Sequence, residues 1–563
     1  MIHHIGPIAG IASWGNWVAT AGYDNQLILW NGSDRSAVAR GYHDHLVNDC
    51  RFSNDGKWLV SASSDYSARI WSIPNLRLQA VLPGHGDDVD MAVFSPDDSK
   101  IATCALDRIV RIFNLNGQCI HEMSGHTGNV LSVSWSKDSQ FVISSSVDGT
   151  IRRWNANSGE LTQTTNLDVR SDSVEIDING TIFAGDDLGR IAILSGEVIN
   201  FVQAHRAGIK KLVVNFQKNH IVTLSYDRSM ATWQINSDLT LKELSRTDYP
   251  VTVWARAACI LENGNIATGT FGSTYALFDP QTNNWNIAGV SGGQSINAVE
   301  LVNSKVYSVG DSGVVHINGQ PTHQMGSLCN FLVASNDLVI TGGQLGSIFN
   351  ANTDEVIYTH HSPLNCGVSY QYGGVSYIAI GAYTGEILVF KHLNSNQIQL
   401  EHVICAFVNA VKGLSYSDGL LFSVCASAQI SWYSVMNWAL IKTKVKAHEK
   451  ITNACCAIGE NHFASVGRDL TLRIWEGDES SIYVTPHQNS IKCMGINTNK
   501  TVILTGSYGG TLSLFDLREK SWIKTSRPTS AGISSIAWDH TKECFLAGSY
   551  DGEIYSISTN TSV

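Results

Sequence analysis

The sequence predicts an all-β fold made of two tandem seven-bladed β-propellers. Three observations support this: a bulky residue closes an apolar segment about every forty residues, an Asp precedes it by six positions, and turn residues separate short apolar runs. The closing positions of the first six repeats are Trp30, Trp71, Phe113, Trp154, Ile193 and Trp233, which lie 41, 42, 41, 39 and 40 residues apart. A period near forty is the length of one four-stranded propeller blade.

Each repeat is expected to hold short antiparallel strands. Segments such as Trp58–Ala62 and Phe141–Ser144 alternate or run apolar over four to seven positions. Turn residues such as those of Phe52–Gly56 and Phe94–Asp98 lie between them.

Polar residues recur in the same register as the bulky positions. A His precedes the closing residue by 28 positions, or by 27 in the case of His448, and a Ser or Thr precedes the Asp by four. The complete sets are His43, Ser61, Asp65 and Trp71; His126, Ser144, Asp148 and Trp154; His205, Thr223, Asp227 and Trp233; and His448, Ser465, Asp469 and Trp475.

This pattern resembles the WD40-repeat family, so the expected fold is two tandem WD40-type β-propellers. The resemblance implies a structural tetrad in which Asp bonds His, His bonds the hydroxyl, and the hydroxyl bonds the Trp indole. The side chains suit this role, because a carboxylate only accepts, His can do both, and an indole only donates.

The register extends to fourteen repeats. The later closing positions are Phe278, Ile317, Asn350, Phe390, Tyr433, Trp475, Phe515 and Ile557. Propellers typically close with four to eight blades, which favours two rings of seven over residues 1–282 and 283–563, with the boundary in Asp279–Gly293. The ninth repeat is the weakest, with a spacing of 33 residues and Gln344 in the Asp position. A second ring of six is therefore the alternative.

Closure of each ring is expected to need an outer strand from elsewhere in the chain, because an open sheet edge invites unwanted pairing. The first inner strand, Ile8–Trp14, begins almost at the N-terminus. Asn284–Val290 is a plausible additional strand, and it could serve either ring.

Composition argues for a cytoplasmic protein without a membrane span. The net charge is −11, from 38 basic and 49 acidic residues, which disfavours nucleic acid as the main partner. Arg206, Lys210 and Lys211 could form a local basic patch, although a solvated loop is the favoured interpretation. Apolar segments are too short to cross a bilayer, the N-terminus lacks the features of a secretion signal, and the twelve cysteines show no C-x-x-C motif.

No enzyme activity, cofactor or metal site is expected. Ser, His and Asp could suggest a hydrolase triad, but a catalytic set occurs once, whereas this set recurs. The pairs His3–His4 and His360–His361 are interpreted as surface or turn residues rather than metal ligands.

The residue before the tetrad Asp position of each repeat is the candidate partner-binding position, whether or not that position holds Asp. In WD40 proteins this position lies on the face that usually meets partners. The candidates are Tyr23, Tyr226, Phe271, Tyr383, Arg468, Tyr508 and Tyr550. Tyr and Arg commonly anchor protein interfaces. We expect Arg468, Tyr508 and Tyr550 to form one patch, while packing of these side chains against neighbouring blades is the alternative.

These observations favour a non-catalytic scaffold or adaptor that binds protein partners in a larger complex. The layout is similar to the actin-interacting-protein-one class, from which actin binding is not carried over. One alternative is a small-molecule or glycan-binding propeller, which would need ionisable groups on the inner strands; Leu131–Trp135 and Leu212–Phe216 offer few. Another is a sensor subunit whose effector lies on another chain. The partner and the oligomeric state stay open.

Overall fold

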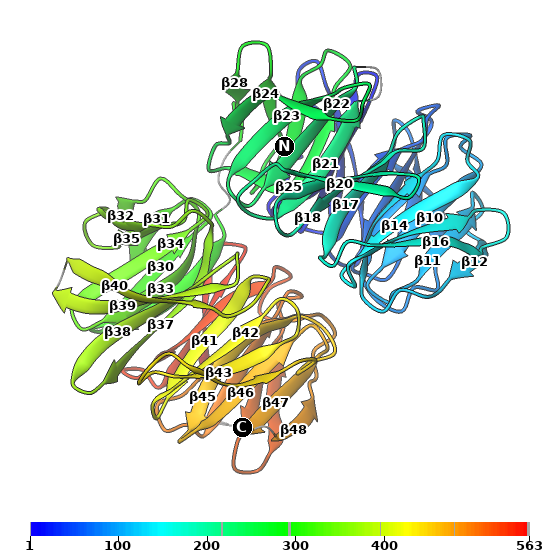
Figure 1. Cartoon of the computed structure of the whole chain (residues 1–563). Helices are drawn as coiled ribbons and strands as arrows, with labels where there is room; N and C mark the ends of the chain where they lie inside the picture. Colours follow the sequence, from blue (N-terminus) through cyan, green and yellow to red (C-terminus); the bar gives the residue numbers. More distant parts are fainter. Residues whose placement is uncertain (1, 216–217, 291–293, 395, 478, 560–563) are drawn as a thin grey trace. The chain divides into compact units, whose positions relative to one another are not determined.

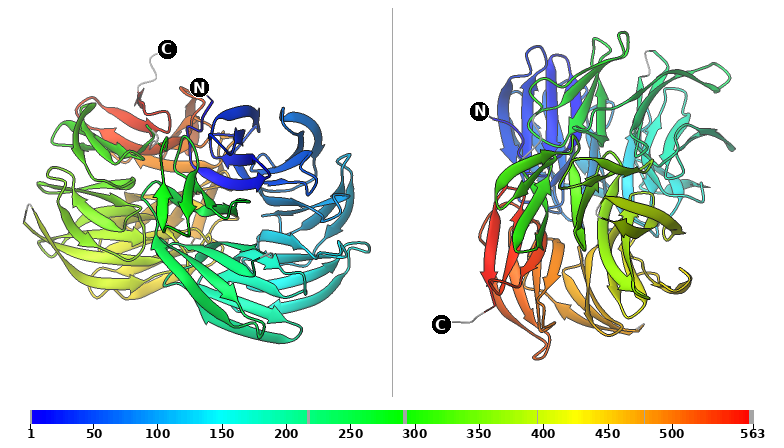
Figure 2. Two further views of the ribbon diagram at one scale, coloured as in Figure 1. Left: turned by 90° about the horizontal axis from the view of Figure 1, so that it is seen from above. Right: turned by 90° about the vertical axis from the view of Figure 1, so that its left-hand side faces the viewer.

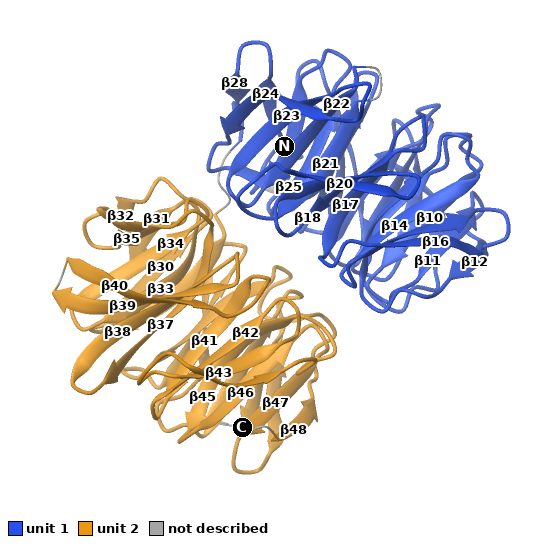
Figure 3. Ribbon diagram, viewed as in Figure 1, with its two compact units in different colours: residues 1–291 blue, residues 292–563 orange. Residues whose placement is uncertain are grey.

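The computed structural model describes residues 2–215, 218–290, 294–394, 396–477 and 479–559 (Figure 1). Every regular element in these ranges is a β-strand, which confirms the all-β prediction. The chain divides into two compact units, residues 1–291 and 292–563 (Figure 3).

Consecutive strands form antiparallel sheets, which we number as blades in chain order. In unit 1 they are blade 1, β1 (Ile8–Trp14), β2 (Trp17–Gly22), β3 (Gln26–Asn31), β4 (Ala37–Tyr42); blade 2, β5 (Val47–Phe52), β6 (Trp58–Ser63), β7 (Ala68–Ser72), β8 (Arg77–Leu82); blade 3, β9 (Val89–Phe94), β10 (Lys100–Ala105), β11 (Val110–Asn114), β12 (Cys119–Met123); blade 4, β13 (Val130–Trp135), β14 (Phe141–Ser146), β15 (Thr150–Asn155), β16 (Leu161–Asn166); blade 5, β17 (Ser171–Ile176), β18 (Ile182–Asp186), β19 (Arg190–Ser195), β20 (Val198–Gln203); blade 6, β21 (Ile209–Asn215), β22 (His220–Ser225), β23 (Ser229–Ile235), β24 (Leu241–Asp248); and blade 7, β25 (Val253–Ile260), β26 (Ile266–Thr270), β27 (Ala276–Asp279), β28 (Asn284–Asn286).

The sheets of unit 2 follow the same order. They are blade 8, β29 (Ile296–Val302), β30 (Lys305–Gly310), β31 (Val314–Ile317), β32 (Gln320–Gln324); blade 9, β33 (Cys329–Ser335), β34 (Leu338–Gly343), β35 (Ser347–Asn350), β36 (Val356–Thr359); blade 10, β37 (Leu364–Tyr372), β38 (Val375–Ala382), β39 (Glu386–Asn394), β40 (Gln397–Cys405); blade 11, β41 (Val411–Ser417), β42 (Leu420–Cys425), β43 (Ile430–Ser434), β44 (Leu440–Lys444); blade 12, β45 (Thr452–Gly459), β46 (His462–Gly467), β47 (Thr471–Glu476), β48 (Glu479–Val484); blade 13, β49 (Ile491–Ile496), β50 (Val502–Ser507), β51 (Leu512–Asp516), β52 (Ser521–Ser526); and blade 14, β53 (Ile533–Asp539), β54 (Cys544–Ser549), β55 (Ile554–Ser558).

The first strand of each blade is the inner strand, and the inner strands contact one another in a closed circle. In unit 1 the contacts run from β1 through β5, β9, β13, β17 and β21 to β25, which contacts β1 again. In unit 2 they run from β29 through β33, β37, β41, β45 and β49 to β53, which contacts β29. Figure 2 shows the blades of each unit from two further directions.

The expectation that an outer strand must come from elsewhere is wrong for unit 1. Each of its blades uses four consecutive strands, and β28 is the outer strand of blade 7, so the sheets of unit 1 extend past residue 282. Blades 1 and 7 meet through packed side chains instead, with Ile11 and Trp30 in the same core cluster as Tyr275. His4 adds a short bridge to Ser273.

The ninth repeat forms a complete four-stranded blade, in which β33 to β36 pair in order. Blade 14 has three strands among the residues that are described.

The strands differ in burial with their position in the blade. In blade 2, the second strand β6 is buried over nearly its whole length, whereas the outer strand β8 is mostly exposed. Strands covered on both faces are expected to be continuously apolar, which explains why the second and third strands carry the clearest sequence signal.

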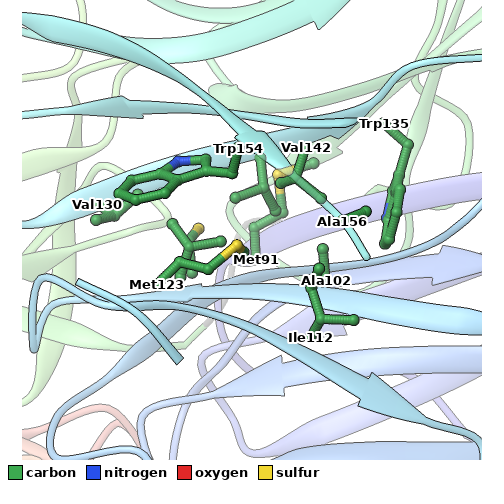
Figure 4. Packing of buried hydrophobic residues seen from close by; sticks show 12 residues of the cluster. Met91, Ala102, Ile112, Met123, Val130, Trp135, Val142, Trp154 and Ala156 are labelled. Atoms are coloured by element: carbon green, nitrogen blue, oxygen red, sulfur yellow. The ribbon is translucent and has the colours of Figure 1, made fainter. Parts of the chain in front are cut away.

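The hydrophobic core lies between neighbouring blades. One cluster joins Met91 and Ile112 of blade 3 to Val142 and Trp154 of blade 4 (Figure 4). Trp154 is only 1% exposed, so the bulky residue that marks each repeat closes the gap between two sheets.

All inner strands begin at the same end of their unit. Because first and second strands are antiparallel, the first residue of an inner strand pairs with the end of the second strand, as Val411 does with Cys425. The starts of the inner strands and the turns between second and third strands therefore share one end, which we call the top face.

A β-bulge recurs at this end. In every blade except the seventh, the second residue of the inner strand has no partner in the second strand. In blade 7 a longer irregularity runs from Val253 to Ala258. A bulge re-aims a side chain out of the regular sheet, so the bulge residues are placed for contacts other than sheet packing.

Candidate partner-binding face

The tetrad residues of blade 12 form a continuous hydrogen-bond chain. Nδ1 of His448 lies 2.9 Å from a carboxylate oxygen of Asp469, and Nε2 lies 2.7 Å from Oγ of Ser465. Nε1 of Trp475 donates to the same hydroxyl at 2.8 Å. The chain ties the start of the inner strand to the second and third strands of its blade.

The other three predicted sets are joined in the same way. The distances from His Nε2 to the hydroxyl are 2.7 Å for His43, 2.8 Å for His126 and 2.8 Å for His205. The corresponding indole bonds are 2.7 Å for Trp71, 2.8 Å for Trp154 and 3.1 Å for Trp233. Their Asp partners are Asp65, Asp148 and Asp227.

Blade 1 holds a further tetrad that the sequence analysis missed. His4 bonds Thr20 at 2.8 Å and Asp24 at 3.0 Å, and Trp30 donates to Thr20 at 2.7 Å. His4 is 1% exposed, so its interpretation as a surface or turn residue is wrong. It precedes Trp30 by 26 positions rather than 27 or 28, so the spacing of the other sets did not identify it.

Two blades keep only the His–hydroxyl half of the chain. His85 bonds Thr103 at 2.9 Å and His487 bonds Thr505 at 2.8 Å. Within the described part of the chain, Nδ1 of each ring is buried without a hydrogen-bond partner. Burial lowers the pKa of each of these histidines to about 4, so both are neutral at physiological pH.

The complete tetrads keep Asp ionised. Burial opposes the charge of Asp469, but the hydrogen bond and charge interaction with His448, together with hydrogen bonds from the Glu449 N–H and from Thr471, lower the pKa of the carboxyl to about 2. Burial also lowers the pKa of His448 itself. A neutral His between a carboxylate and a hydroxyl satisfies all three groups.

This geometry does not suit nucleophilic catalysis. The hydroxyl of Ser465 is fully buried and sits between His448 and the indole of Trp475. A substrate could reach the oxygen only by displacing the Trp ring, so the tetrads serve to brace the blades.

His360 and His361 do not form an isolated pair. Nε2 of His360 lies 3.2 Å from Glu386, and Nε2 of His361 lies 3.8 Å from the same carboxylate. His360 is 6% exposed, so the surface interpretation is wrong for it. The three ligand atoms lie within 4.8 Å of one another, which is close enough for a metal ion. Glu386, however, is already hydrogen-bonded to His360 and to Thr384. The Glu386–His360 bond takes the place of the Asp–His bond found in the tetrads.

The seven candidate partner-binding residues all lie on the top face. Each donates its backbone N–H, over 2.8 to 3.2 Å, to the carbonyl just before the inner strand of its own blade. These residues are Tyr23, Tyr226, Phe271, Tyr383, Arg468, Tyr508 and Tyr550. Phe271 is buried and the other six are half-buried, so their side chains are partly packed and partly accessible.

Two of the three residues expected in one patch touch each other. The rings of Tyr508 and Tyr550 are stacked, with centroids 6.2 Å apart and planes at 21°. Burial raises the pKa of the Tyr550 hydroxyl well above its usual value, with Tyr508 and Asp311 as further contributors. Arg468 lies two blades from Tyr550 on the same face.

The bulge residues of unit 2 carry a second pattern that sequence analysis missed. They are Asn297, Asn330, Asn365, Lys412, Asn453, Lys492 and Ser534. Each Asn donates Nδ2 over 2.7 to 3.1 Å to the carbonyl of the first residue of the next inner strand. Ser534 donates in the same way to Ile296, from the last blade to the first. These bonds brace the inner circle.

A sequence signal for the bulge position existed. In blades with a recognisable His, the bulge residue lies five positions later, as Asn453 does after His448 and Lys492 after His487. This five-residue spacing marks a single position whose residue type varies, so it can be recognised only once the bulge is known.

The inner strands of unit 1 carry more ionisable groups than expected. Lys210 lies 2.7 Å from Asp172 and 2.5 Å from Asp187, and Arg256 lies 2.9 Å from Asp90. The expectation that the inner strands carry few ionisable groups is therefore wrong for unit 1. Lys210 lies on β21 with its side chain 9% exposed, so it belongs neither to a basic surface patch nor to a solvated loop.

Three inner-strand cations of unit 1, Arg51, Lys210 and Arg256, are thus paired with carboxylates of the same unit. Burial disfavours the charge of Lys210, yet Asp172 and Asp187 raise the pKa of its ammonium group. Arg51 is similarly held 3.0 Å from Asp49.

Among the residues described, no helix is long and apolar enough to cross a membrane.

Comparisons with known proteins agree with this architecture. The family model described as "WD domain, G-beta repeat" matches residues 37–72, 76–114, 117–155 and 479–516. Each segment covers the outer strand of one blade and the first three strands of the next, and the blades whose first three strands are matched are blades 2, 3, 4 and 13.

Individual relatives match over shorter parts of the chain. The WD repeat-containing protein 26 homolog of Arabidopsis thaliana is 32% identical over 122 residues, which cover 21% of each protein. Nuclear distribution protein nudF of Emericella nidulans is 25% identical over 186 residues, 29% of this chain and 42% of the relative. A guanine nucleotide-binding protein subunit beta-like protein of Encephalitozoon cuniculi is 30% identical over 130 residues, 22% of this chain and 39% of the relative. The chain therefore spans less than half the length of each of these relatives.

Proposed function

Since this chain carries WD40 repeats and has a WD40-type propeller fold, we propose that it is a non-catalytic scaffold that binds protein partners and assembles or regulates a larger complex. The observation that carries the proposal is the top face of unit 2. There, Arg468, Tyr508 and Tyr550 are held by backbone hydrogen bonds and keep part of each side chain accessible.

Rigid placement favours binding by these residues. A stacked aromatic pair loses little conformational entropy when a partner packs on it, and Tyr and Arg are the residues most often found at interface hot spots. Binding and packing are compatible for these residues. Tyr508 and Tyr550 pack against each other across neighbouring blades, and part of each residue stays accessible.

The small-molecule alternative has one observation in its favour, which is the set of charges on the inner strands of unit 1. Several of those charges are held in ion pairs of 2.5 to 3.0 Å, as in Lys210 with Asp172 and Arg51 with Asp49. A ligand would have to displace these ion pairs, so we favour the scaffold. A sensor role with the effector on another chain is a special case of the same scaffold.

The proposed location is the cytoplasm. The twelve cysteines are free thiols, several of them buried as small apolar residues in strands, and such thiols are typical of a reducing compartment.

The experiment is affinity purification of the full chain from its native host, followed by mass spectrometry. Replacing Arg468, Tyr508 and Tyr550 together with Ala is expected to remove the specifically bound proteins. The matched control replaces Tyr23, Tyr226 and Phe271, which hold the same positions in unit 1.

Thermal melting of both triple variants shows whether they are folded at the temperature of capture. Some loss of stability is expected in both, because the side chains are partly packed. Equal capture by the unit 2 variant and the unmodified protein would contradict the proposal, as would equal loss in both variants.

A further inference from the structure

The end of unit 2 opposite the top face carries a group of aromatic side chains in blades 10 and 11. The inner and third strands finish at this end, so it holds the turns that follow β37, β39, β41 and β43. Blade 10 extends far in this direction, because β37, β39 and β40 each have nine residues, more than any other described strand (Figure 1). We call this end of blades 10 and 11 the lower face.

Four aromatic rings of the lower face pack on one another. The ring of Tyr370 is stacked between Tyr377 and Tyr416, with centroids 5.6 Å and 4.5 Å away. The indole of Trp438 meets Tyr377 edge-on, with centroids 5.7 Å apart. Tyr370 is buried and the other three are half-buried, so the rings form one aromatic surface across two blades that is partly accessible.

Hydrogen bonds hold this surface in place. The hydroxyl of Tyr416 in blade 11 donates over 3.2 Å to the carbonyl of Gln371 in blade 10 and accepts the N–H of Gly419, also at 3.2 Å. Val435 donates its N–H over 2.9 Å to the carbonyl of Gly419, which joins this turn to the turn that carries Trp438. A partner therefore meets rings that are already ordered.

The hydroxyl of Tyr370 is a polar group that the aromatic surface leaves unsatisfied. Tyr370 is 6% exposed, and within the described part of the chain its oxygen has no hydrogen-bond partner. A buried polar group without a partner is costly. A ligand rich in N–H donors matches a surface that offers aromatic faces and an unused acceptor.

Two carboxylates border the surface in blades 11 and 12. Asp418 lies in the turn that Tyr416 closes with its hydroxyl, and it is exposed. The neighbouring Ser417 donates over 2.7 Å to the carbonyl of Gly459, which directly precedes the exposed Glu460. Neither carboxylate has a basic side chain within 4.0 Å among the residues that the structure describes.

A third carboxylate borders the surface in blade 10. Glu401 is the exposed bulge residue beside His402, whose ring is stacked on Trp438 with centroids 6.2 Å apart. Lys391 is a cation of the same region, since it pairs with Tyr377 between β38 and β39. The three acidic side chains outnumber it.

The wider charge distribution at this end of unit 2 follows the same trend. The turns of blades 9 to 12 at this end contain no Lys or Arg, and their described acidic residues are Asp337, Asp354, Glu355, Asp418 and Glu460. The corresponding turns of blades 13 and 14 carry the basic residues Lys500, Arg518, Lys520 and Lys542 beside Glu519 and Glu543. Negative charge is thus concentrated on the side that holds the aromatic rings.

We propose that the lower face of blades 10 and 11 binds an arginine-rich segment of a protein partner. Aromatic faces attract cations, and the planar guanidinium group stacks on them better than an ammonium group does. The bordering carboxylates add electrostatic complementarity. They also favour this occupant over a proline-rich segment, which packs on aromatic rings but carries no charge. This surface is separate from the top face, so the inference goes beyond the function proposed above.

The test is isothermal titration calorimetry of the full chain with a peptide of four Arg-Gly repeats, acetylated and amidated at its ends. We expect saturable binding that weakens with salt. The same peptide with citrulline in place of arginine keeps the planar group without its charge, and it should not bind. A Lys-Gly peptide should bind more weakly, and octaproline should not bind.

Carboxylate variants test the electrostatic part of the site. Glu401→Gln and Asp418→Asn should each weaken binding of the Arg-Gly peptide about threefold, and together about tenfold. Asn is chosen because Asp418 has a φ of 44°, which Asn tolerates. Glu519→Gln, in an exposed turn of blade 13 at the same end, is the matched control and should leave binding unchanged.

Trp438→Asn tests the aromatic part. Trp438 has a φ of 61°, so Asn suits this backbone while removing the ring. The variant should bind the Arg-Gly peptide about threefold more weakly and lose the preference for arginine over lysine. Thermal melting shows that it is folded. A purely structural indole would instead leave the ratio of the two affinities unchanged.

The inference is overturned if the Arg-Gly peptide fails to bind at millimolar concentration, or binds the Glu401→Gln, Asp418→Asn double variant as tightly as the unmodified protein. Equal binding of the citrulline peptide or of octaproline would also overturn it, because the surface would then not recognise a cation. If partner capture depends on Arg468, Tyr508 and Tyr550 while peptide binding is indifferent to both carboxylates, the scaffold function stands and this inference falls.

Discussion

In the blades that hold a tetrad, a single hydroxyl oxygen serves two buried partners. In blade 4, Oγ of Ser144 lies 2.8 Å from both His126 Nε2 and Trp154 Nε1. An unsatisfied buried polar group costs more than an average hydrogen bond contributes, so the hydroxyl matters out of proportion to its size.

Ser144→Ala is expected to lower the free energy of unfolding of unit 1 by about 2–4 kcal/mol, because it leaves an imidazole and an indole without their partner. Urea unfolding followed by Trp fluorescence measures the change. Ser124→Ala, at an exposed turn position in the same region, should have almost no effect. Similar losses in both variants would argue against the tetrad as a brace.

His487 makes unit 2 sensitive to mild acid. Its pKa of about 4 in the folded protein lies below the usual value near 6.5, so the unfolded chain binds the proton first. The stabilisation is complete above pH 6.5 and is lost as the pH falls from 6.5 to about 4, by up to about 3 kcal/mol.

His487→Gln should flatten this part of the stability profile, although the variant is less stable at pH 8 because it loses the bond to Thr505. Urea unfolding between pH 4 and 8 provides the measurement. An unchanged slope between pH 6.5 and 4 would show that His487 does not titrate as described. In blade 12, Asp469 acts against burial and raises the pKa of His448, whereas blade 13 has Gly509 at the position of that Asp.

At the scale of elements, the bulge in each inner strand connects neighbouring blades. The Asn453 side chain is buried and donates over 2.7 Å to the carbonyl of Ile491, 38 residues away in the next blade. The bulge frees this side chain from the sheet, so the blades are joined by hydrogen bonds as well as by apolar packing.

Asn453→Ala is expected to destabilise unit 2 by about 1–2 kcal/mol and to loosen the junction between β45 and β49. Faster amide hydrogen exchange confined to blades 12 and 13 would show the local opening. Asn499→Ala, at an exposed position of blade 13, is the control. Uniform acceleration across all of unit 2 would contradict a local role.

For the whole molecule, each unit closes its own circle of inner strands, and every sheet of the described residues is built from strands of one unit. The core between blades 1 and 7 includes Trp30 and Tyr275, so the first and last blades of unit 1 depend on each other. Closure is therefore a property of the complete unit.

Residues 1–291 and 292–563, expressed separately, should each fold with a cooperative melting transition. Residues 1–250, which lack blade 7, should fail to do so because the apolar faces of blades 1 and 6 lose their cover. Circular dichroism melting and size-exclusion chromatography distinguish these outcomes. A cooperative, monomeric 1–250 fragment would show that the circle is not required.

The repeat, the strands and four tetrads were accessible from the sequence because each depends on positions within a single blade. The six-residue spacing between Asp65 and Trp71 is repeated in other blades, and each repeat again contains short apolar or alternating segments. His4 escaped because its spacing to Trp30 differs, and the strand that completes blade 7 was ambiguous because no local pattern assigns an outer strand to a ring.

The charges were not accessible in this way. Whether a lysine at the bulge is neutralised depends on carboxylates in the preceding blade, as for Lys210 and Asp172, 38 residues apart. The periodic pattern of the sequence determines the strands within each blade. Ion pairs, in contrast, form between side chains of neighbouring blades. That is why the architecture could be derived from the order of the amino acids, while the pairing of Lys210 with Asp172 and Asp187 emerged only when the blades were closed into circles.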